Sequence, residues 1–381
     1  MKHPSRRRAI ARRLLAAAIL LAGVAGAALS PAAAASTGPV AIGARALGMG
    51  GAYTAVAEGL EGLYWNPAGL AGGRFDLYGT LAGGPNLDLV TQLQKATADP
   101  EQFAQDFALS EGDQSSTLEV GTLVGLKALS YAIGGYGQFA GELTKTGSLS
   151  VSGKTDVTLT ARWIATTAAA GAWSVRAPLG LGSASVGVAV KRLEVSDVLF
   201  SQQYKAGAPP TVDERQRDLA GNGVGIDLGV RASLTPWVTV GAVVRNAGGV
   251  RVEWSGTDST VTKDATSGAE LSETTHSLPD PELLPAEFRV GAALRPPVLG
   301  AVIAADVTGD GSLYVGVEKR FLFDLVALRL GRAMPKDGPA STTFGMGFGL
   351  GPVRFNAGLA TTPTDDGGSH TYTALELGVR F

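Results

Sequence analysis

Apolar and polar residues alternate through much of the second half of this chain. Between residues 222 and 381 we find nine alternating segments of about ten residues each. In the last segment, one face carries Thr371, Thr373, Leu375, Leu377, Val379 and Phe381. Because strand side chains point alternately to two faces, each segment has one apolar and one polar side. About ten residues also suffice for a tilted strand to cross a bilayer. A soluble β-sandwich would alternate in the same way, so other features must decide.

Residues 1–35 have the features of a secretory signal peptide. Lys2 and five arginines precede an apolar run from Leu14, and small residues at 33–35 offer a cleavage site. An uncleaved membrane anchor is the alternative. Removing these six of the 32 basic residues leaves 26 against 34 acidic residues, a net charge of −8. That balance argues against a nucleic-acid partner. The chain has no cysteine, which excludes disulfides and lipoprotein anchoring.

We predict fourteen strands, at residues 74–83, 117–127, 131–143, 155–170, 182–195, 223–234, 237–247, 286–295, 298–307, 311–321, 324–333, 341–350, 352–361 and 370–381. Their connections alternate: most even-numbered ones are tight turns, whereas the odd-numbered ones include the long loops 84–116, 196–222 and 248–285. Short turns on one rim and long loops on the other are typical of outer-membrane barrels. The predicted fold class is therefore all-β, a transmembrane barrel of about fourteen antiparallel strands in the outer membrane of a diderm bacterium.

The two faces of these strands differ in charge. The charge-free stripe should face lipid, because Arg or Lys at mid-bilayer costs about 2–4 kcal/mol. The glycine-rich stripe should line the lumen, and its charged members are Asp227, Arg231, Arg289, Glu318 and Arg354. Missing side chains leave room for close backbone packing. We therefore predict that residues 36–73 form a hatch inside a barrel built by residues 74–381.

The N-terminal part of the mature chain carries a distinct motif. Residues 43–71 read GARALGMGGAYTAVAEGLEGLYWNPAGLA, with a short helical turn predicted at 58–63 that ends at Asn66-Pro67. A flexible linker is the plain alternative, but a linker would not need so many large apolar residues. The motif closely resembles the start of PorV-type outer-membrane proteins, which are related to FadL-type long-chain fatty acid channels; TraF-like proteins begin similarly. Residues 235–241 and 284–291 extend the resemblance.

The resemblance implies a fourteen-stranded barrel with a luminal hatch. Its hatch and ligand-path candidates are Gly48, Gly50, Gly51, Asn66, Pro67 and Ala68. In the fatty acid channels such a hatch shifts and releases an apolar ligand through the barrel wall, which implies passive transport of hydrophobic compounds. In PorV-like relatives the barrel instead serves a protein secretion or surface-assembly system. The partners implied are membrane lipid with either apolar small molecules or secretion-system proteins. An open diffusion porin is disfavoured, because a hatch would occlude the lumen.

Catalytic chemistry has little support in the sequence. After signal removal the histidines are His276 and His370, both in predicted loops without the buried, oriented setting of a catalytic histidine. Residues 306–311 resemble a calcium loop but lack its ligand spacing, so we predict a hairpin. We expect no enzyme activity, no metal site and no cofactor. Apolar residues of the loop 84–116 fit equally a ligand groove and a helix packed on the barrel mouth.

The carboxy-terminus carries an assembly signal. Leu377, Val379 and Phe381 form an apolar stripe that ends on an aromatic residue, which resembles the signal read by the barrel-insertion machinery. We expect the last strand to close the barrel against the first, where Arg74, Asp76 and Tyr78 on the luminal side beside Glu376 and Arg380 would allow cross-strand charge pairing. An open edge in hydrocarbon would leave backbone groups without hydrogen bonds at several kcal/mol each.

Overall fold

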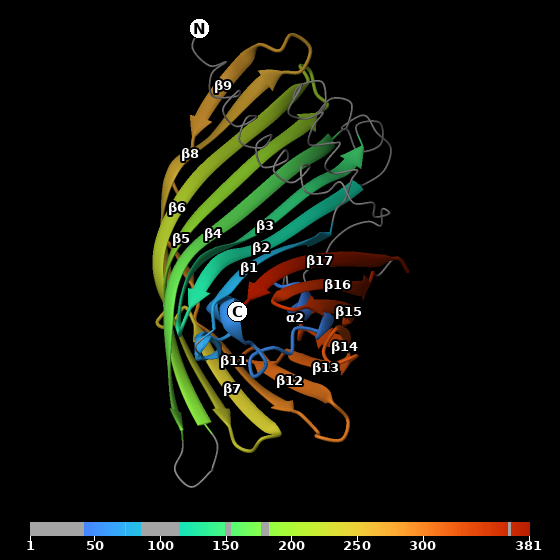
Figure 1. Cartoon of the computed structure of the whole chain (residues 1–381). Coiled ribbons are helices and arrows are strands. Elements are labelled where there is room, and N and C mark those ends of the chain that lie inside the picture. The colour runs from blue at the N-terminus through green and yellow to red at the C-terminus, as the bar shows by residue number, and fades with distance from the viewer. Residues whose placement is uncertain (1–41, 73, 85–113, 149–153, 177–182, 365–366) are drawn as a thin grey trace.

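The protein is a closed barrel of fourteen antiparallel strands (Figure 1). The computed structural model describes residues 42–72, 74–84, 114–148, 154–176, 183–364 and 367–381. The barrel strands are β1 (Asp76–Gly84), β2 (Gln114–Ala128), β3 (Tyr131–Ser148), β4 (Lys154–Arg176), β5 (Ser183–Lys205), β6 (Thr211–Ser233), β7 (Val238–Arg245), β11 (Glu287–Leu294), β12 (Ala301–Thr308), β13 (Leu313–Phe321), β14 (Val326–Met334), β15 (Ser341–Leu350), β16 (Val353–Pro363) and β17 (Ser369–Arg380). Each overlaps one predicted strand, so the predicted fold class is confirmed.

The barrel closes where the first and last strands meet. β1 pairs with β2 on one side and with β17 on the other, with Asp76 opposite Arg380. These two side chains form an ion pair of 2.9 Å, one of the charge pairings that the sequence allows between the first and last strands. Beyond the strands, the backbones of Phe75 and Phe381 exchange two hydrogen bonds of 3.0 and 3.1 Å. The terminal phenylalanine is thus part of the seam.

Two of the predicted long loops were wrong in detail. Residues 196–222 are largely the extended ends of β5 and β6, which pair until Lys205 meets Thr211. Residues 248–285 contain three further strands, β8 (Val250–Asp264), β9 (Glu270–Thr275) and β10 (Glu282–Leu284). Polar, charged sequence suggested loops, but backbone pairing with a neighbouring strand supplies the hydrogen bonds that composition does not reveal. Residues 85–113, most of the third predicted loop, lie outside the described residues.

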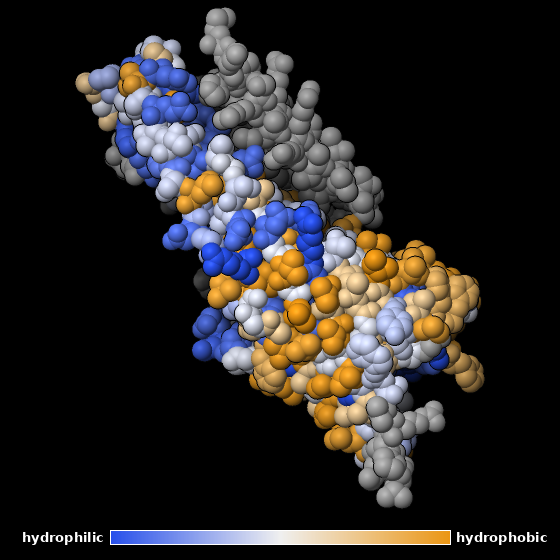
Figure 2. Space-filling view, turned by 90° about the vertical axis from the view of Figure 1, so that its left-hand side faces the viewer, coloured by the Kyte–Doolittle hydropathy of each residue, from blue (hydrophilic) through white to orange (hydrophobic). Residues whose placement is uncertain are grey.

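One side of the barrel is much taller than the other. β4, β5 and β6 each have 23 residues, whereas β7 and β11 have 8. About ten residues cross a bilayer, so the tall side projects well beyond it. Figure 2 shows this division: apolar side chains gather over the lower, closed part and polar ones over the upper extension.

An apolar belt surrounds the lower part. Val224, Ile226, Leu228 and Val230 of β6 are 43–69% exposed, while the alternate Asp227 is buried. Phe344, Met346 and Phe348 of β15 are exposed in the same way. Large aromatic residues are exposed near the rim with the short turns: Tyr131, Trp173, Trp237, Phe321, Phe323 and Phe381. An aromatic girdle beside an apolar belt is the surface of a membrane-spanning barrel.

The N-terminal residues fold into short helices rather than strands. They are α2 (Ala44–Gly48), η1 (Gly59–Glu61), α3 (Gly62–Trp65) and η2 (Pro67–Leu70). α2 contacts β14 to β17, whereas η2 contacts β4 to β6 on the opposite side of the barrel (Figure 1). Residues 42–72, which we call the luminal segment, therefore lie inside the barrel. Among the described residues, no helix has the length and apolar character needed to cross a membrane.

Candidate functional site

The luminal segment packs against the wall through glycine. A Cβ atom added to Gly241 would lie 2.8 Å from the Thr54 carbonyl oxygen, and one added to Gly358 would lie 2.6 Å from that of Ala44. The same steric limit applies at Gly187, Gly229, Gly316, Gly331 and Gly345. All seven positions belong to the glycine-rich stripe of different strands. Absence of side chains there lets the backbone of the luminal segment approach the strands directly.

The predicted hatch glycines lie on this interface. Gly48 packs on Gly345, where a Cβ atom would come within 2.8 Å of the Gly345 Cα. Gly50 and Gly51 have φ of +64° and +81°, a conformation that other residues rarely adopt. They turn the chain immediately after α2, so that residues 52–55 run toward β7 and β12. A side chain at either position would be strained.

A buried charge cluster fixes α2 to the wall at β13 and β14. The Arg45 guanidinium donates to both Glu318 carboxylate oxygens, at 2.8 and 3.0 Å. Arg329 of β14 donates to the same carboxylate at 2.6 Å, and Arg320 at 2.9 Å. The Glu318 side chain has no exposed surface. Charge-assisted hydrogen bonds from three guanidinium groups to one buried carboxylate bind α2 to the wall, and removing one partner would leave an uncompensated charge in a dry site.

A second cluster holds the chain after α2. Asp306 of β12 accepts hydrogen bonds from the backbone nitrogens of Tyr53 and Thr54, at 2.9 and 2.8 Å. Arg289 pairs with Asp306 at 2.8 Å and also donates to the Gly51 carbonyl oxygen. The Arg289 guanidinium lies over the rings of Tyr314 and Trp65, at 4.2 and 5.1 Å from their centroids. The Arg289–Asp306 pair therefore holds residues 51 to 54 of the luminal segment on the wall.

The other predicted hatch residues contact the opposite wall. Asn66 donates to the carbonyl oxygens of Thr54 and Val230, at 3.0 and 3.1 Å, and accepts from the Ala68 nitrogen at 3.1 Å. Ser185 of β5 donates to the Ala68 carbonyl oxygen at 3.1 Å. Pro67 packs on Gly187. Asn66 thereby caps η2 and ties the luminal segment to β6.

Carboxylates of the luminal segment sit in contrasting surroundings. Burial, together with the nearby Glu376 carboxylate, raises the pKa of Glu61 to about 8. Tyr53 donates to Glu61 at 2.7 Å. Burial would also raise the pKa of Glu58, but the Arg231 guanidinium at 2.9 Å lowers it below its ordinary value. The segment thus carries one carboxyl group that titrates near neutral pH and one that stays charged.

The predicted lumen-lining residues divide into three groups. Glu318, Arg289 and Arg231 contact the luminal segment, as described above. Asp227 instead pairs with Lys191 of β5 at 2.7 Å, away from the segment. Arg354 is exposed and donates to the Gly351 carbonyl oxygen of its own turn, at 2.7 Å. The structure therefore places Arg354 at the rim and outside the charge clusters.

Sequence reasoning missed several residues of this interface. Arg45 looked like one polar residue of a motif, and Asp306 like part of a calcium-like loop. In the structure residues 309–312 form the turn between β12 and β13, while Asp306 points inward. A charged residue on the luminal stripe of a strand was the available signal for Asp306. Among the described residues, no group of three or more potential metal ligands comes together.

Comparison with known proteins gives similarity in structure alone. No family model and no curated protein sequence matches the chain. The Pseudomonas putida toluene transporter TodX has a TM-score of 0.57 at 14% identity, covering 89% of this chain and 97% of its own. The CymD monoaromatic hydrocarbon channel has a TM-score of 0.52 at 14% identity, with 90% and 97% coverage. The Ralstonia pickettii toluene transporter TbuX reaches 0.52 at 12% identity, with 89% and 97% coverage.

This chain shares their fold. The FadL-like side of the predicted resemblance is therefore supported at the level of architecture. The PorV-type and TraF-like resemblances stay predictions.

Proposed function

We propose that this protein is an outer-membrane channel for passive passage of small apolar compounds, with the luminal segment as a movable hatch. One observation carries the proposal: a compact segment fills the lumen of a barrel whose fold is that of hydrocarbon channels. Ile42, Met49, Leu60 and Leu63 of this segment have no exposed surface. A lumen packed in this way does not suit free diffusion of polar solutes.

The contacts between the luminal segment and the barrel wall are of a kind that allows the segment to leave the wall and return. It is attached to the wall through ion pairs, hydrogen bonds and glycine contacts. Single polar contacts contribute about 0.5–3 kcal/mol each, so subsets of them exchange without unfolding of the barrel. We extend the proposal to export through the signal peptide at residues 1–35 and to insertion guided by Leu377, Val379 and Phe381.

A reversible cross-link tests whether the hatch moves. The chain has no cysteine, so an introduced pair supplies the only thiols. Glu58 of the luminal segment pairs with Arg231 of β6 at 2.9 Å, so cysteines at these two positions are within reach of a short bifunctional methanethiosulfonate. Glu58→Cys with Arg231→Cys, joined through this reagent, ties the segment to β6. In cells lacking other hydrocarbon channels, the reagent should abolish uptake of radiolabelled toluene, and reductant should restore it.

The control places the same bond within the wall. Val317→Cys with Leu330→Cys joins paired, outward-facing residues of β13 and β14. Treatment of this control with the same reagent should leave uptake unchanged. Equal uptake by the cross-linked hatch variant would refute a moving hatch. No uptake by the wild type above the vector background would refute transport of apolar compounds itself.

A scaffold for protein secretion or surface assembly is the second candidate. It is favoured by the projecting sheet: all six residues of β9 are exposed, and β9 pairs only with β8 within the described residues. An exposed strand edge can accept a strand from another protein. Cross-linking in intact membranes distinguishes the two functions, because a scaffold should recover protein partners in stoichiometric amounts and a channel should not.

A further inference from the structure

The apolar belt ends at one level on β5 and β6. On β6 the uppermost belt residue is Val224, and the next outward-facing residue is Asn222. Val224 pairs with Arg192 of β5, which follows the exposed Val190 on the same face, and Glu194 comes next. Figure 2 shows polar side chains directly above the apolar ones. In a membrane-spanning barrel this boundary lies where hydrocarbon meets the lipid headgroups. It faces the outer leaflet, because the short turns of such barrels are periplasmic.

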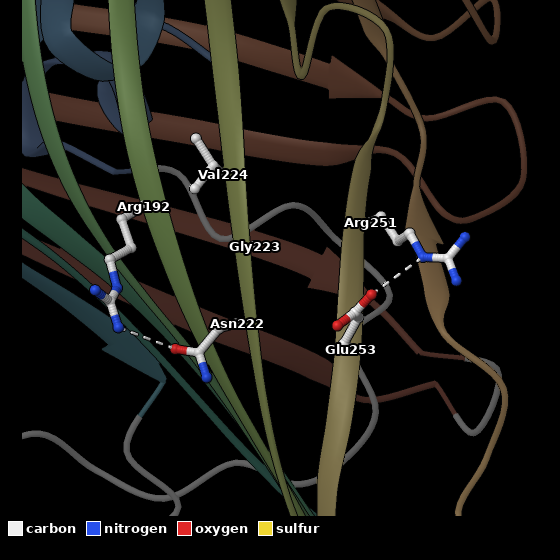
Figure 3. Close-up of a pocket in the computed structure, with 6 residues that line it drawn as sticks. All are labelled: Arg192, Asn222, Gly223, Val224, Arg251 and Glu253. Carbon is white, nitrogen blue, oxygen red and sulfur yellow. Dashed lines mark hydrogen bonds and ion pairs between the residues drawn. The ribbon is translucent and has the colours of Figure 1, made fainter.

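A hollow opens in the outer surface at this boundary (Figure 3). The ladder between β6 and β8 ends at Asn222 and Glu253, and residues 250–252 of β8 pair with β10 instead. The departure of β8 leaves a space of about 310 Å³, lined by Arg192, Asn222, Gly223, Val224, Arg251 and Glu253. This volume lies at the lower end of the range for ligand sites, about 300–1,000 Å³.

Two arginines stand on either side of Val224 in this hollow. Arg192 is its partner on β5, and Arg251 lies two residues before Glu253 on β8, at the same level. Two strand spacings, at least about 10 Å, therefore separate the two backbones. Glu194 and Glu253 lie one row farther from the apolar belt, opposite the two sides of Asn222. The arginines thus form the row nearer to the lipid.

The two guanidinium groups have only weak partners. Arg192 Nε lies 3.4 Å from Glu194, Arg251 Nε lies 3.6 Å from Glu253, and all four side chains are 63–76% exposed. Charge-assisted hydrogen bonds are shorter, at about 2.7–2.9 Å. Arg192 also donates to the Asn222 side chain, at 3.4 Å. Within the described part of the chain no carboxylate lies closer to either arginine, so their terminal nitrogens can donate to a further acceptor.

Other arginines of the projecting sheet are paired more closely. Arg217 lies 2.7 Å from Asp197, and Arg215 lies 2.8 Å from Asp258. The arginines of the hollow differ from these in both distance and place, since they stand at the membrane boundary. A guanidinium group donates two parallel hydrogen bonds to phosphate and is less strongly hydrated than an ammonium group. Two such groups beside the headgroup layer suit a phosphorylated lipid.

We propose that this hollow binds the phosphorylated sugar headgroup of an outer-leaflet lipid. Arg192 and Arg251 donate to phosphate oxygens, and the Asn222 amide, which can both donate and accept, bonds sugar hydroxyls. The acyl chains continue over the exposed Ile226 and Leu228 below. This continuity with the apolar belt favours a lipid over free phosphate. The proposal goes beyond the channel function and does not depend on transport, since it needs only the position of the barrel in the membrane.

Binding to the purified, full-length barrel tests the site. Delipidated protein in detergent is titrated with lipid A, which carries phosphate on a disaccharide, and native mass spectrometry counts the bound lipid. Arg192→Gln with Arg251→Gln should weaken binding about 100-fold, since each lost charge-assisted hydrogen bond accounts for about tenfold. Arg354→Gln is the control, because Arg354 is exposed at the opposite rim. Equal affinities in the two variants would overturn the proposal and leave the channel function standing.

Two further ligands identify the group that is recognised. Lipid A without its phosphates should bind the wild type no better than lipid A binds the double variant. Inorganic phosphate in millimolar excess should displace none of the bound lipid. Tight binding of the dephosphorylated lipid would overturn phosphate recognition. Displacement by inorganic phosphate would overturn the assignment of the site to a lipid.

Glu253→Gln separates direct binding from binding through a cation. Removing this exposed negative charge should strengthen lipid A binding about two- to fivefold, because the carboxylate repels phosphate and competes for Arg251. Binding should also persist in the presence of a chelator. Weaker binding by the variant, or loss of binding in the chelator, would mean that a divalent cation links Glu253 to the lipid. Either result would overturn direct donation by the arginines.

Discussion

The two sides of the lumen hold the same segment in different ways. At β12 to β14, buried charges bind it: Glu318 joins Arg45 to Arg329, and Asp306 joins Arg289 to the backbone of residues 53 and 54. The ladders of these strands are continuous. At β5 to β7, glycine contacts, Asn66 and the partly exposed Arg231–Glu58 pair hold it, and β6 forms no ladder with β7 or β8 over residues 223–227. Strong anchoring thus coincides with a regular wall, and weak anchoring with an irregular one.

The glycine contacts on the anchored side should be the least tolerant of change. Gly331→Val places a branched side chain against the backbone of Met49 and Gly50, neither of which can move without displacing α2. We expect loss of the folded-barrel band in heat-modifiable gel migration. Gly79→Val is the control, because nothing lies within 4 Å of a Cβ atom there. Normal folding of the Gly331 variant would mean that close packing on this side is dispensable.

Loss of the Glu318 charge cluster should have the second largest effect on stability. Glu318→Gln leaves Arg45 and Arg329 buried without their counter-ion and should cost about 3–5 kcal/mol. The temperature at which the folded band disappears measures the loss. Glu253→Gln on β8 should change stability by less than about 0.5 kcal/mol, since Glu253 is exposed and its pair with Arg251 is 3.6 Å long. Similar losses in both variants would remove the contrast between the two sides.

A pH series should reveal Glu61. Arg45, Tyr53, Glu376 and Arg380 surround this group, and its pKa is raised from 4.5 to about 8. The folded state then keeps a proton that the unfolded chain releases, so stability falls as pH rises from about 4.5 to about 8 and levels off above. The free energy of unfolding should fall by about 3 kcal/mol between pH 5 and pH 7. Glu61→Gln should flatten this part of the pH profile of the band-shift temperature; an unchanged slope would assign it to other groups.

Arg354 should give the smallest effect. It is exposed, and within the described part of the chain its hydrogen bonds go to the carbonyl oxygens of Gly351 and Val353, so Arg354→Ala should change stability by no more than about 0.5 kcal/mol. Toluene uptake should equal that of the wild type. Arg289→Ala is the informative partner, because the same residue type on the luminal stripe contacts Asp306, Gly51 and two aromatic rings. Comparable effects in the two variants would contradict the division of the predicted lumen-lining residues.

The sequence by itself determined the barrel. Period-two alternation predicts strands, and the placement of charge decides which face meets lipid, because a charge in hydrocarbon is costly. Glycines on the inner stripe pointed to a segment packed inside. Each of these patterns is local, since it can be recognised within a single strand of about ten residues.

The tertiary structure alone decided which partners meet. Arg45 and Glu318 are 273 residues apart, and no local pattern pairs them. The extended ends of β5 and β6 and the added strands β8 to β10 arise from backbone pairing, in stretches whose polar composition predicts loops. Arg354 and Glu318 both belong to the predicted luminal stripe, but Arg354 lies at the rim of the barrel. Its position along the barrel axis depends on where its strand begins. The alternation of residues shows which face of a strand each side chain lies on. The depth of that side chain in the barrel and the residue it contacts depend on how the strands close into the barrel.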